Sequence, residues 1–110
     1  MDVPASAIAW PAETGGLAAL DRPRLSVVVV NYVRWDDTAR LVRQLRRSSA
    51  FGREAEVVIV DNHSPPHPAI ARLRRSEGVS LMRWRKNRGF ARAANEGCRL
   101  SRGEDRKSVV

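Results

Sequence analysis

Residues 25–32, LSVVVVNY, and residues 57–62, VVIVDN, are two apolar runs that each end abruptly in polar residues. β-Branched runs without polar alternation are typical of strands that are buried on both faces, as in a parallel sheet. Residues 87–97, NRGFARAANEG, follow with a Gly-bearing turn that opens a helix of small residues. The carboxyl ends of parallel strands share one edge of the sheet, and nucleotides bind in crevices at that edge. The three stretches therefore predict one nucleotide-binding pocket in an α/β fold.

The rest of the chain predicts a sheet with helices on its faces. Asp36 or Asp37 can cap the first helix, and a strand, a helix and a second strand form a right-handed βαβ unit. We expect a three-stranded parallel sheet in the spatial order third, second, first. The expected elements are strand 25–30, a helix from about Thr38, strand 56–60, helix 69–75, strand 79–84 and helix 89–100.

The net charge of +8 is concentrated in one part of the sequence. Residues 1–71 hold eight basic and eight acidic side chains, whereas residues 72–102 hold ten basic and two acidic ones. The field of this second segment would attract a nucleotide diphosphate, an anionic membrane surface or nucleic acid. A solvated surface without a partner is the alternative interpretation. The sequence has neither zinc-ligand spacing nor an exposed aromatic stacking platform, so we expect no nucleic-acid partner.

The organisation of the chain predicts one small domain between two other segments. Residues 1–24 combine prolines, glycines and alanines with poor apolar periodicity, which indicates a disordered leader or linker. Residues 25–103 form the domain, and we expect residues 104–110 to be a non-native tail. The sequence has no signal-peptide pattern and no apolar run near the roughly 18 residues that a membrane span needs. The single cysteine excludes an internal disulfide, and a cytoplasmic location is expected.

Asp61 is the first candidate binding residue, because it directly follows the second buried strand. Its carboxylate is expected at the carboxyl edge of the sheet, where it can accept hydrogen bonds from a ribose hydroxyl or a base N–H. Asn31 and Tyr32 end the first strand and are candidates for the same pocket. The alternative interpretations are structural: Asp61 and Asn62 form an ordinary turn, and Tyr32 is an aromatic residue at the rim of the core.

The turn of Asn87, Arg88 and Gly89 is the second part of the candidate site. Gly89 permits close backbone approach, and the first N–H groups of the following helix are available to an anion. Arg88 or Arg92 can add positive charge for a diphosphate. An ordinary capped helix, closely packed through its small residues, is the alternative.

The same helix has an apolar face. Phe90, Ala94, Gly97 and Cys98 fall on this face at helical spacing, so we expect Cys98 to be a small core residue rather than a reactive thiol.

Two histidines and two tryptophans are also interpreted structurally. The spacing of His63 and His67 suits zinc on a helix, but the prolines between them prevent a helix, so no metal site is expected. Trp35 and Trp84 are expected to be packing residues.

The two strand ends and the turn at 87–97, at this spacing and in this order, resemble the family 2 glycosyltransferases, which have the GT-A fold. Within that family the sequence looks like rhamnosyltransferase-like members that extend bacterial surface polysaccharides. The resemblance covers residues 25 to about 103. It implies that Asp61 contacts the nucleoside, often a uracil ring, and that Asn31 and Tyr32 lie under the nucleobase.

The resemblance also implies an activity. Such enzymes transfer a sugar from a nucleoside diphosphate donor to a hydroxyl of a saccharide or lipid-linked acceptor, in some cases at the membrane surface. Mg or Mn neutralises the leaving diphosphate. In the family pattern, Asn87, Arg88 and Gly89 form the turn that precedes the helix of small residues.

The sequence departs from the family pattern after Gly103. The metal-binding Asp-x-Asp-like motif does not follow, and residues 104–110 supply no catalytic base. We therefore expect a truncated, Rossmann-like nucleotide-binding half of a GT-A domain that is inactive by itself. A non-catalytic nucleotide-binding or interaction module is the alternative function. Without a neighbouring strand, residues 25–30 would be an exposed apolar edge that promotes self-association.

Overall fold

The computed structural model describes residues 25–48, 55–103 and 106–110. The predicted leader, residues 1–24, lies outside the described residues. The elements in the described ranges are β1 (Leu25–Asn31), α3 (Trp35–Arg46), β2 (Ala55–Asp61), α4 (Ala69–Arg75), β3 (Val79–Arg83), α5 (Phe90–Leu100) and β4 (Arg106–Val109). In this part of the chain, no helix has the length and apolar character that crossing a membrane requires.

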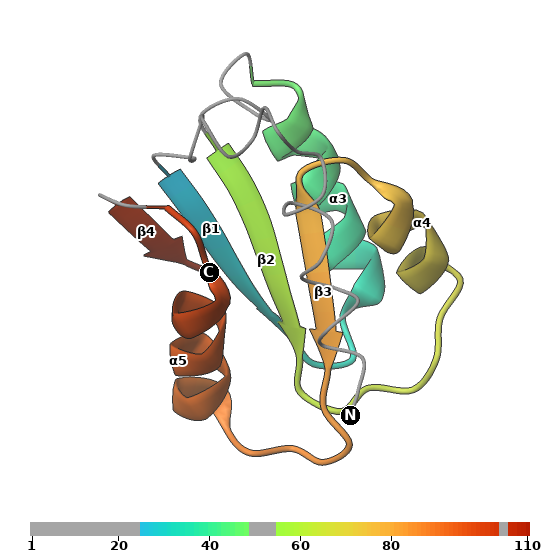
Figure 1. Ribbon diagram of the computed structural model, residues 1–110. Coiled ribbons are helices and arrows are strands. Elements are labelled where there is room, and N and C mark those ends of the chain that lie inside the picture. Colours follow the sequence, from blue (N-terminus) through green and yellow to red (C-terminus); the bar gives the residue numbers. More distant parts are fainter. Residues whose placement is uncertain (1–24, 49–54, 104–105) are drawn as a thin grey trace.

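The strands form one sheet in the order β3-β2-β1-β4, with every neighbouring pair parallel (Figure 1). β1 and β2 pair in register from Leu25 with Ala55 to Asn31 with Asp61. The arrangement of β3, β2 and β1 confirms the three predicted parallel strands and their order. Their carboxyl ends point to the lower edge of the molecule in Figure 1, where the loops that follow them gather.

β4 is a fourth strand, beyond the three that were predicted, and it lies beside β1. Leu25 pairs with Arg106 and Val28 with Val109, and the Val110 N–H donates to the Val28 carbonyl at 2.9 Å. The prediction that residues 25–30 form an exposed edge is therefore wrong, because β4 pairs with their backbone. β4 belongs to the segment that we expected to be a non-native tail. That expectation concerns the origin of the segment and stays a prediction.

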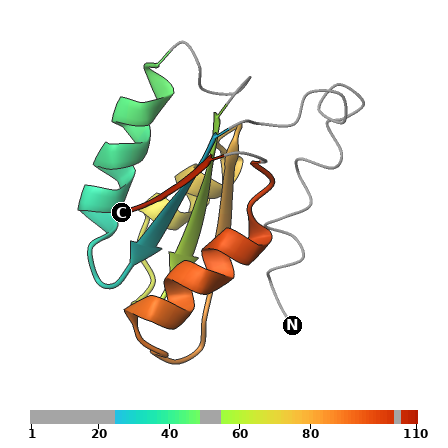
Figure 2. The ribbon, with the colours of Figure 1, turned by 90° about the vertical axis from the view of Figure 1, so that its left-hand side faces the viewer.

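Helices cover the sheet on both faces, with α3 and α4 on one face and α5 on the other (Figure 2). Alternate residues of each strand point to opposite faces, so a strand covered on both faces is apolar at successive positions. The side facing α3 and α4 holds the main core. Its buried members are Val27, Val29, Trp35, Ala39, Val42, Val57, Ile59, Ala69, Leu73, Val79 and Leu81.

α3 begins three residues earlier than predicted, at Trp35 rather than near Thr38. Asp36 and Asp37 lie in its first turn, where carboxylates favour the helix dipole, and they do not cap it. The Trp35 side chain is buried, and its Nε1–H donates to the Pro65 carbonyl at 3.1 Å. This contact with a distant loop holds the start of α3. A local capping pattern in the sequence could not have indicated it.

α5 packs against β1 and β2 through small residues. Ala93 is fully buried, and a Cβ at Gly97 would overlap with the Val28 side chain. The predicted packing face was wrong at Phe90, which is 59% exposed, and Cys98 is only half-buried. Because Gly97 lets the helix approach the sheet closely, the buried stripe runs through Ala93 and Gly97.

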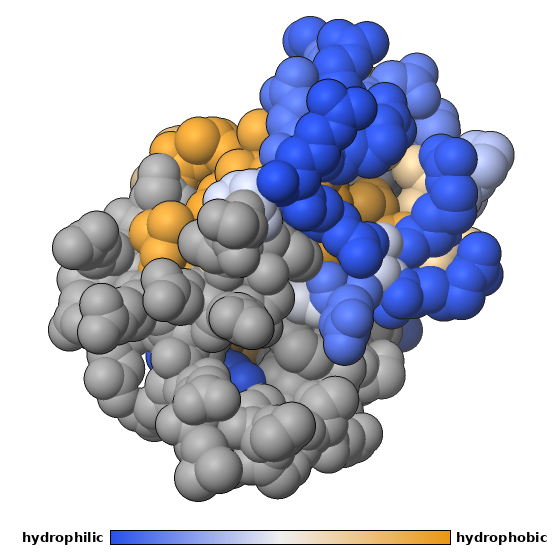
Figure 3. Space-filling view, turned by 90° about the horizontal axis from the view of Figure 1, so that it is seen from above, coloured by the Kyte–Doolittle hydropathy of each residue, from blue (hydrophilic) through white to orange (hydrophobic). Residues whose placement is uncertain are grey.

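The positive charge divides between the two edges of the sheet. The last turns of α3 and α4 carry basic residues, including Arg43 and Arg72, and both helices run antiparallel to the strands. These arginines therefore lie near the amino edge, where Figure 3 shows hydrophilic side chains gathered. Arg83 ends β3, and Arg85 and Arg88 follow it at the carboxyl edge.

Candidate functional site

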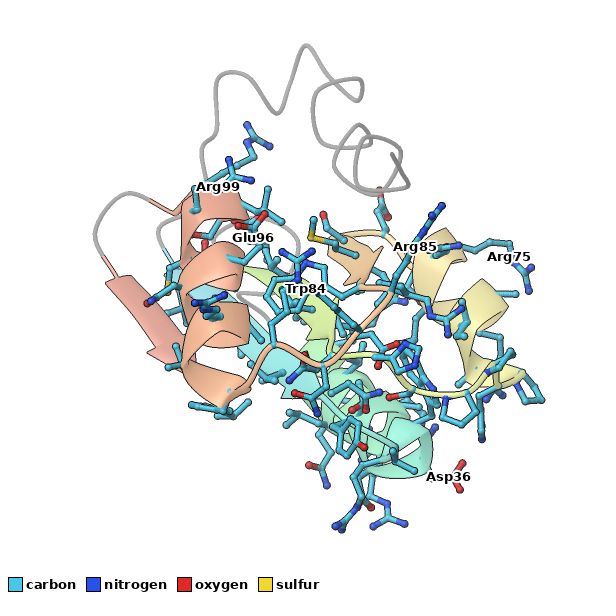
Figure 4. The ribbon with its side chains drawn as sticks, turned by 90° about the horizontal axis from the view of Figure 1, so that it is seen from below. Asp36, Arg75, Trp84, Arg85, Glu96 and Arg99 are labelled. Atoms are coloured by element: carbon cyan, nitrogen blue, oxygen red, sulfur yellow. The ribbon has the colours of Figure 1, made fainter. Side chains whose placement is uncertain are left out.

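A cleft of about 690 Å³ lies at the carboxyl edge of the sheet. Its volume falls within the roughly 300–1,000 Å³ that is usual for small-molecule sites. In the view onto this edge, Trp84 lies on the side toward α5 and Arg85 on the side toward α4 (Figure 4). The lining residues are Tyr32, Val33, His63, Ser64, Pro65, Pro66, Arg83, Trp84 and Arg85.

Asn31 and Asp61 are register partners at the ends of β1 and β2, and they are buried next to the cleft. Asn31 Nδ2 donates to Asp61 Oδ1 at 3.0 Å, and the Thr38 hydroxyl donates to Asn31 Oδ1 at 2.6 Å. Asn31 is 1% exposed and Asp61 is 0% exposed. The structure thus brings these two predicted residues together, as buried groups whose neighbours line the cleft.

The Asp61 carboxylate accepts hydrogen bonds at both oxygens. Oδ1 also accepts from the Ser64 hydroxyl at 2.5 Å. Oδ2 accepts from the Ser64 N–H at 3.1 Å and from Arg83 Nε at 3.2 Å. A buried carboxylate is stable only with such compensation. A ligand can therefore bond to Asp61 only by displacing, or sharing an oxygen with, one of these donors.

Ser64 and Arg83 are site residues that the sequence reasoning missed. The Ser64 hydroxyl accepts the Val33 N–H at 2.7 Å, and Arg83 Nη2 donates to the Ser64 carbonyl at 2.6 Å. These bonds join the loops after β1 and β2 to the end of β3. The rule that singled out Asp61 would also have found Arg83, because both residues end a buried strand. Ser64 was detectable as a polar residue three positions after Asp61, within reach of an Asx turn.

Two aromatic residues form walls of the cleft. Tyr32 is 51% exposed, and Trp84 is half-buried. Tyr32 was predicted as a site residue, whereas Trp84 was expected only to pack, and the structure places its side chain on the cleft. The Arg88 guanidinium lies 5.0 Å from the centre of the Trp84 ring. The cleft therefore offers ring faces for stacking beside cationic donors.

The turn of Asn87, Arg88 and Gly89 adjoins the cleft without lining it. The Arg88 N–H donates to Asn62 Oδ1 and the Gly89 N–H donates to Asn87 Oδ1, both at 2.8 Å. Gly89 has a φ of +91°, and no atom lies within 4 Å of a Cβ built there. Its backbone conformation, rather than close approach of another group, therefore explains the glycine.

Glu96, on α5, is already held by a cation. Arg99 Nη2 lies 2.6 Å from Glu96 Oε2. This hydrogen bond is the main cause that lowers the pKa of Glu96 below its ordinary value, and the charge of Arg88 adds to the effect. Burial opposes the shift. Glu96 is therefore a charged, paired carboxylate rather than a candidate proton carrier.

The described residues do not form a site for a divalent metal. No three His, Cys, Asp or Glu side chains come together among them. His67 Nε2 lies 3.4 Å from Asp36, and its Nδ1 accepts the Ala69 N–H at 2.9 Å. Asp61 is enclosed by protein donors. No reaction step is therefore assigned to a metal held by these residues.

Comparisons with known proteins agree with this architecture. The sequence model described as "Glycosyl transferase family 2" matches residues 26–110. The chain is also similar to a solved structure, the mannosyltransferase PcManGT from Pyrobaculum calidifontis in complex with GDP-Man and Mn2+, at 25% sequence identity and a TM-score of 0.62. That match covers 73% of this chain and 25% of the mannosyltransferase chain. No curated protein matches the sequence.

Proposed function

The chain belongs to glycosyl transferase family 2, and on this premise we propose that its cleft binds the nucleoside diphosphate part of a sugar donor. The observation that carries the proposal is the cleft itself, in which Tyr32 and Trp84 stand beside Arg83 and Arg85 at the carboxyl edge of a parallel sheet. Ring faces suit a nucleobase, and guanidinium groups suit a diphosphate. The similar mannosyltransferase was solved with GDP-Man, a ligand of this class.

Each predicted residue has a role in this proposal. Tyr32 and Trp84 supply the ring faces on which the nucleobase stacks. Asn31 and Asp61 hold the loops that shape the nucleoside end, and Asp61 contacts the nucleoside where a ligand displaces one of its donors. Asn87, Arg88 and Gly89 shape the turn on the diphosphate side, where the arginine adds positive charge.

The proposed reaction of the complete enzyme is transfer of the donor sugar to an acceptor hydroxyl, on a saccharide or a lipid-linked acceptor, in cell-surface polysaccharide synthesis. Mg or Mn is the proposed metal, since the similar mannosyltransferase holds Mn2+. The described residues of this chain do not provide a ligand set for it. We therefore expect residues 1–110 alone to bind a nucleotide without transferring sugar. The cytoplasmic location and the contact with a membrane surface stay predictions.

Isothermal titration with UDP, dTDP and GDP tests the binding proposal. We expect measurable binding of at least one of them, and a Kd that rises by roughly tenfold in Trp84→Ala, because one stacked base contributes about 1–3 kcal/mol. Arg75→Ala is the matched control, since Arg75 lies in the last turn of α4, outside the cleft.

Absence of binding by every nucleotide would contradict the proposal. Equal Kd values for the unmodified chain and Trp84→Ala would place the nucleotide elsewhere. Specific binding without any role in sugar transfer by the full-length enzyme would favour the alternative, a non-catalytic nucleotide-binding module.

A further inference from the structure

Two residues of the cleft have a left-handed backbone. Val33 has a φ of 56° and His63 a φ of 74°, and the described residues contain no other non-glycine residue with a positive φ. Such conformations are uncommon outside glycine and are strained for residues with a Cβ. Both residues line the cleft. Within residues 25–48, 55–103 and 106–110, the unfavourable backbone is therefore confined to the candidate site.

Hydrogen bonds on both sides hold His63 in this conformation. On one side, the Asn62 N–H donates to the Asn31 carbonyl at 2.8 Å, and Asn62 Oδ1 accepts the Arg88 N–H at 2.8 Å. On the other side, the Ser64 N–H donates to the Asp61 carboxylate at 3.1 Å. Strain that is fixed by its surroundings in this way concentrates at ligand-binding sites.

His63 is one of the residues that line the cleft. It is exposed, and within the described part of the chain it makes no hydrogen bond, ion pair or ring contact. The neighbouring Arg83 and Arg85 can only donate hydrogen bonds, whereas a neutral imidazole also accepts one. His63 thus adds an acceptor to a cleft whose cations have none.

We propose that His63 is a specificity-determining residue that accepts a hydrogen bond from the nucleoside of the bound donor. This inference rests on the proposed function of the cleft. The observations that carry it are the left-handed backbone of His63 and its exposed position in the cleft lining. Glycine would fit this conformation without strain, so the imidazole is the part of His63 to which we assign a function.

Two substitutions of His63 distinguish a role in ligand binding from a purely structural role in the turn. His63→Gly relieves the backbone strain, so its Tm rises, by roughly 2–6 °C for a domain of this size. If the imidazole contacts the nucleoside, the Kd of His63→Gly for the best-binding nucleoside diphosphate rises by about 3–10-fold, the loss expected for one hydrogen bond. His63→Ala loses the same affinity without the gain in Tm, because alanine keeps the strain.

The ribose and the base are distinguished with matched ligands. If UDP or GDP binds best and the contact is to the ribose 2′-hydroxyl, the 2′-deoxy form of that nucleotide binds the unmodified chain and His63→Gly equally. Because dTDP already lacks this hydroxyl, a weaker binding of dTDP by His63→Gly would exclude the 2′-hydroxyl as the contact. If the contact is to the base, the loss persists with the 2′-deoxy form.

If His63→Gly raises the Tm and leaves the Kd unchanged, the inference about His63 is overturned. The proposed function still stands in that case, provided that Trp84→Ala weakens binding. Absence of nucleotide binding by the unmodified chain would overturn both.

Discussion

The side chains of Asn31 and Asp61 meet across β1 and β2, with Asn31 Nδ2 at 3.0 Å from Asp61 Oδ1. Ser64 and Arg83 complete this contact, so polar side chains at the end of β1, after β2 and at the end of β3 share one carboxylate. The cleft is built on this shared acceptor.

Replacement of Asp61 tests its structural role. Asp61→Ala leaves the Asn31 amide, the Ser64 hydroxyl and the Arg83 guanidinium without their buried partner. We expect the free energy of unfolding to fall by about 3 kcal/mol, measured by urea denaturation. Asp37→Ala is the control, because its pair with Arg34 is exposed and should contribute less than about 1 kcal/mol. Equal effects of the two substitutions would contradict the network.

Gly97 sets the distance between α5 and the sheet. Gly97→Ala inserts a methyl group where the Val28 side chain already lies. We expect a loss of about 1–3 kcal/mol in unfolding free energy from overpacking, although alanine is the better helix former. In a double-mutant cycle measured by thermal unfolding, Gly97→Ala should cost less stability in a Val28→Ala background than in the unmodified chain, because the smaller side chain removes the overlap. Strict additivity of the two effects would refute the close contact.

The Glu56 carboxylate holds the segment that follows α5 through a hydrogen bond. Its Oε2 accepts the Ser26 hydroxyl at 2.6 Å and the Arg102 N–H at 2.5 Å, and the carboxylate is buried. We expect Glu56→Ala to release β4, so that the Val30 N–H, which donates to the Val110 carbonyl at 3.2 Å, exchanges faster with solvent deuterium. The Val57 N–H, bonded to the Gly78 carbonyl, is the internal control. Equal acceleration at both amides would indicate global unfolding instead.

The pair of Glu96 and Arg99 gives a pH-dependent contribution to stability. Because the pKa of Glu96 is lowered in the folded state, the pair stabilises the fold above the unfolded-state value of about 4.3. That contribution is lost as the pH falls through the lowered pKa. The urea midpoint of the unmodified chain should therefore exceed that of Glu96→Gln at pH 7, and the difference should shrink toward pH 3. A difference that stays constant with pH would exclude the ion pair as its cause.

Much of the fold was predictable because its signals are local. The uninterrupted β-branched run of β1 predicts a strand buried on both faces, and α4 (Ala69–Arg75) has the predicted bounds, since it follows a proline-rich loop and precedes Gly78. The parallel order of β1, β2 and β3 follows from the handedness of βαβ crossovers. The edge of the sheet that carries the cleft was predictable for the same reason.

What only the tertiary structure decided depends on residues that are distant in sequence. Residues 106–109, RKSV, have no apolar alternation, so their pairing with β1 depends on the backbone of a strand about eighty residues earlier. The sequence placed Asp61 at the right edge, but its burial depends on Arg83 and Ser64, whose side chains reach it only in the folded chain. The left-handed backbone of His63 is likewise held by partners on β1 and before α5. Apolar periodicity and strand ends are local properties that the sequence shows directly. The donors that bond to a buried carboxylate come from separate elements, so they depend on how those elements pack.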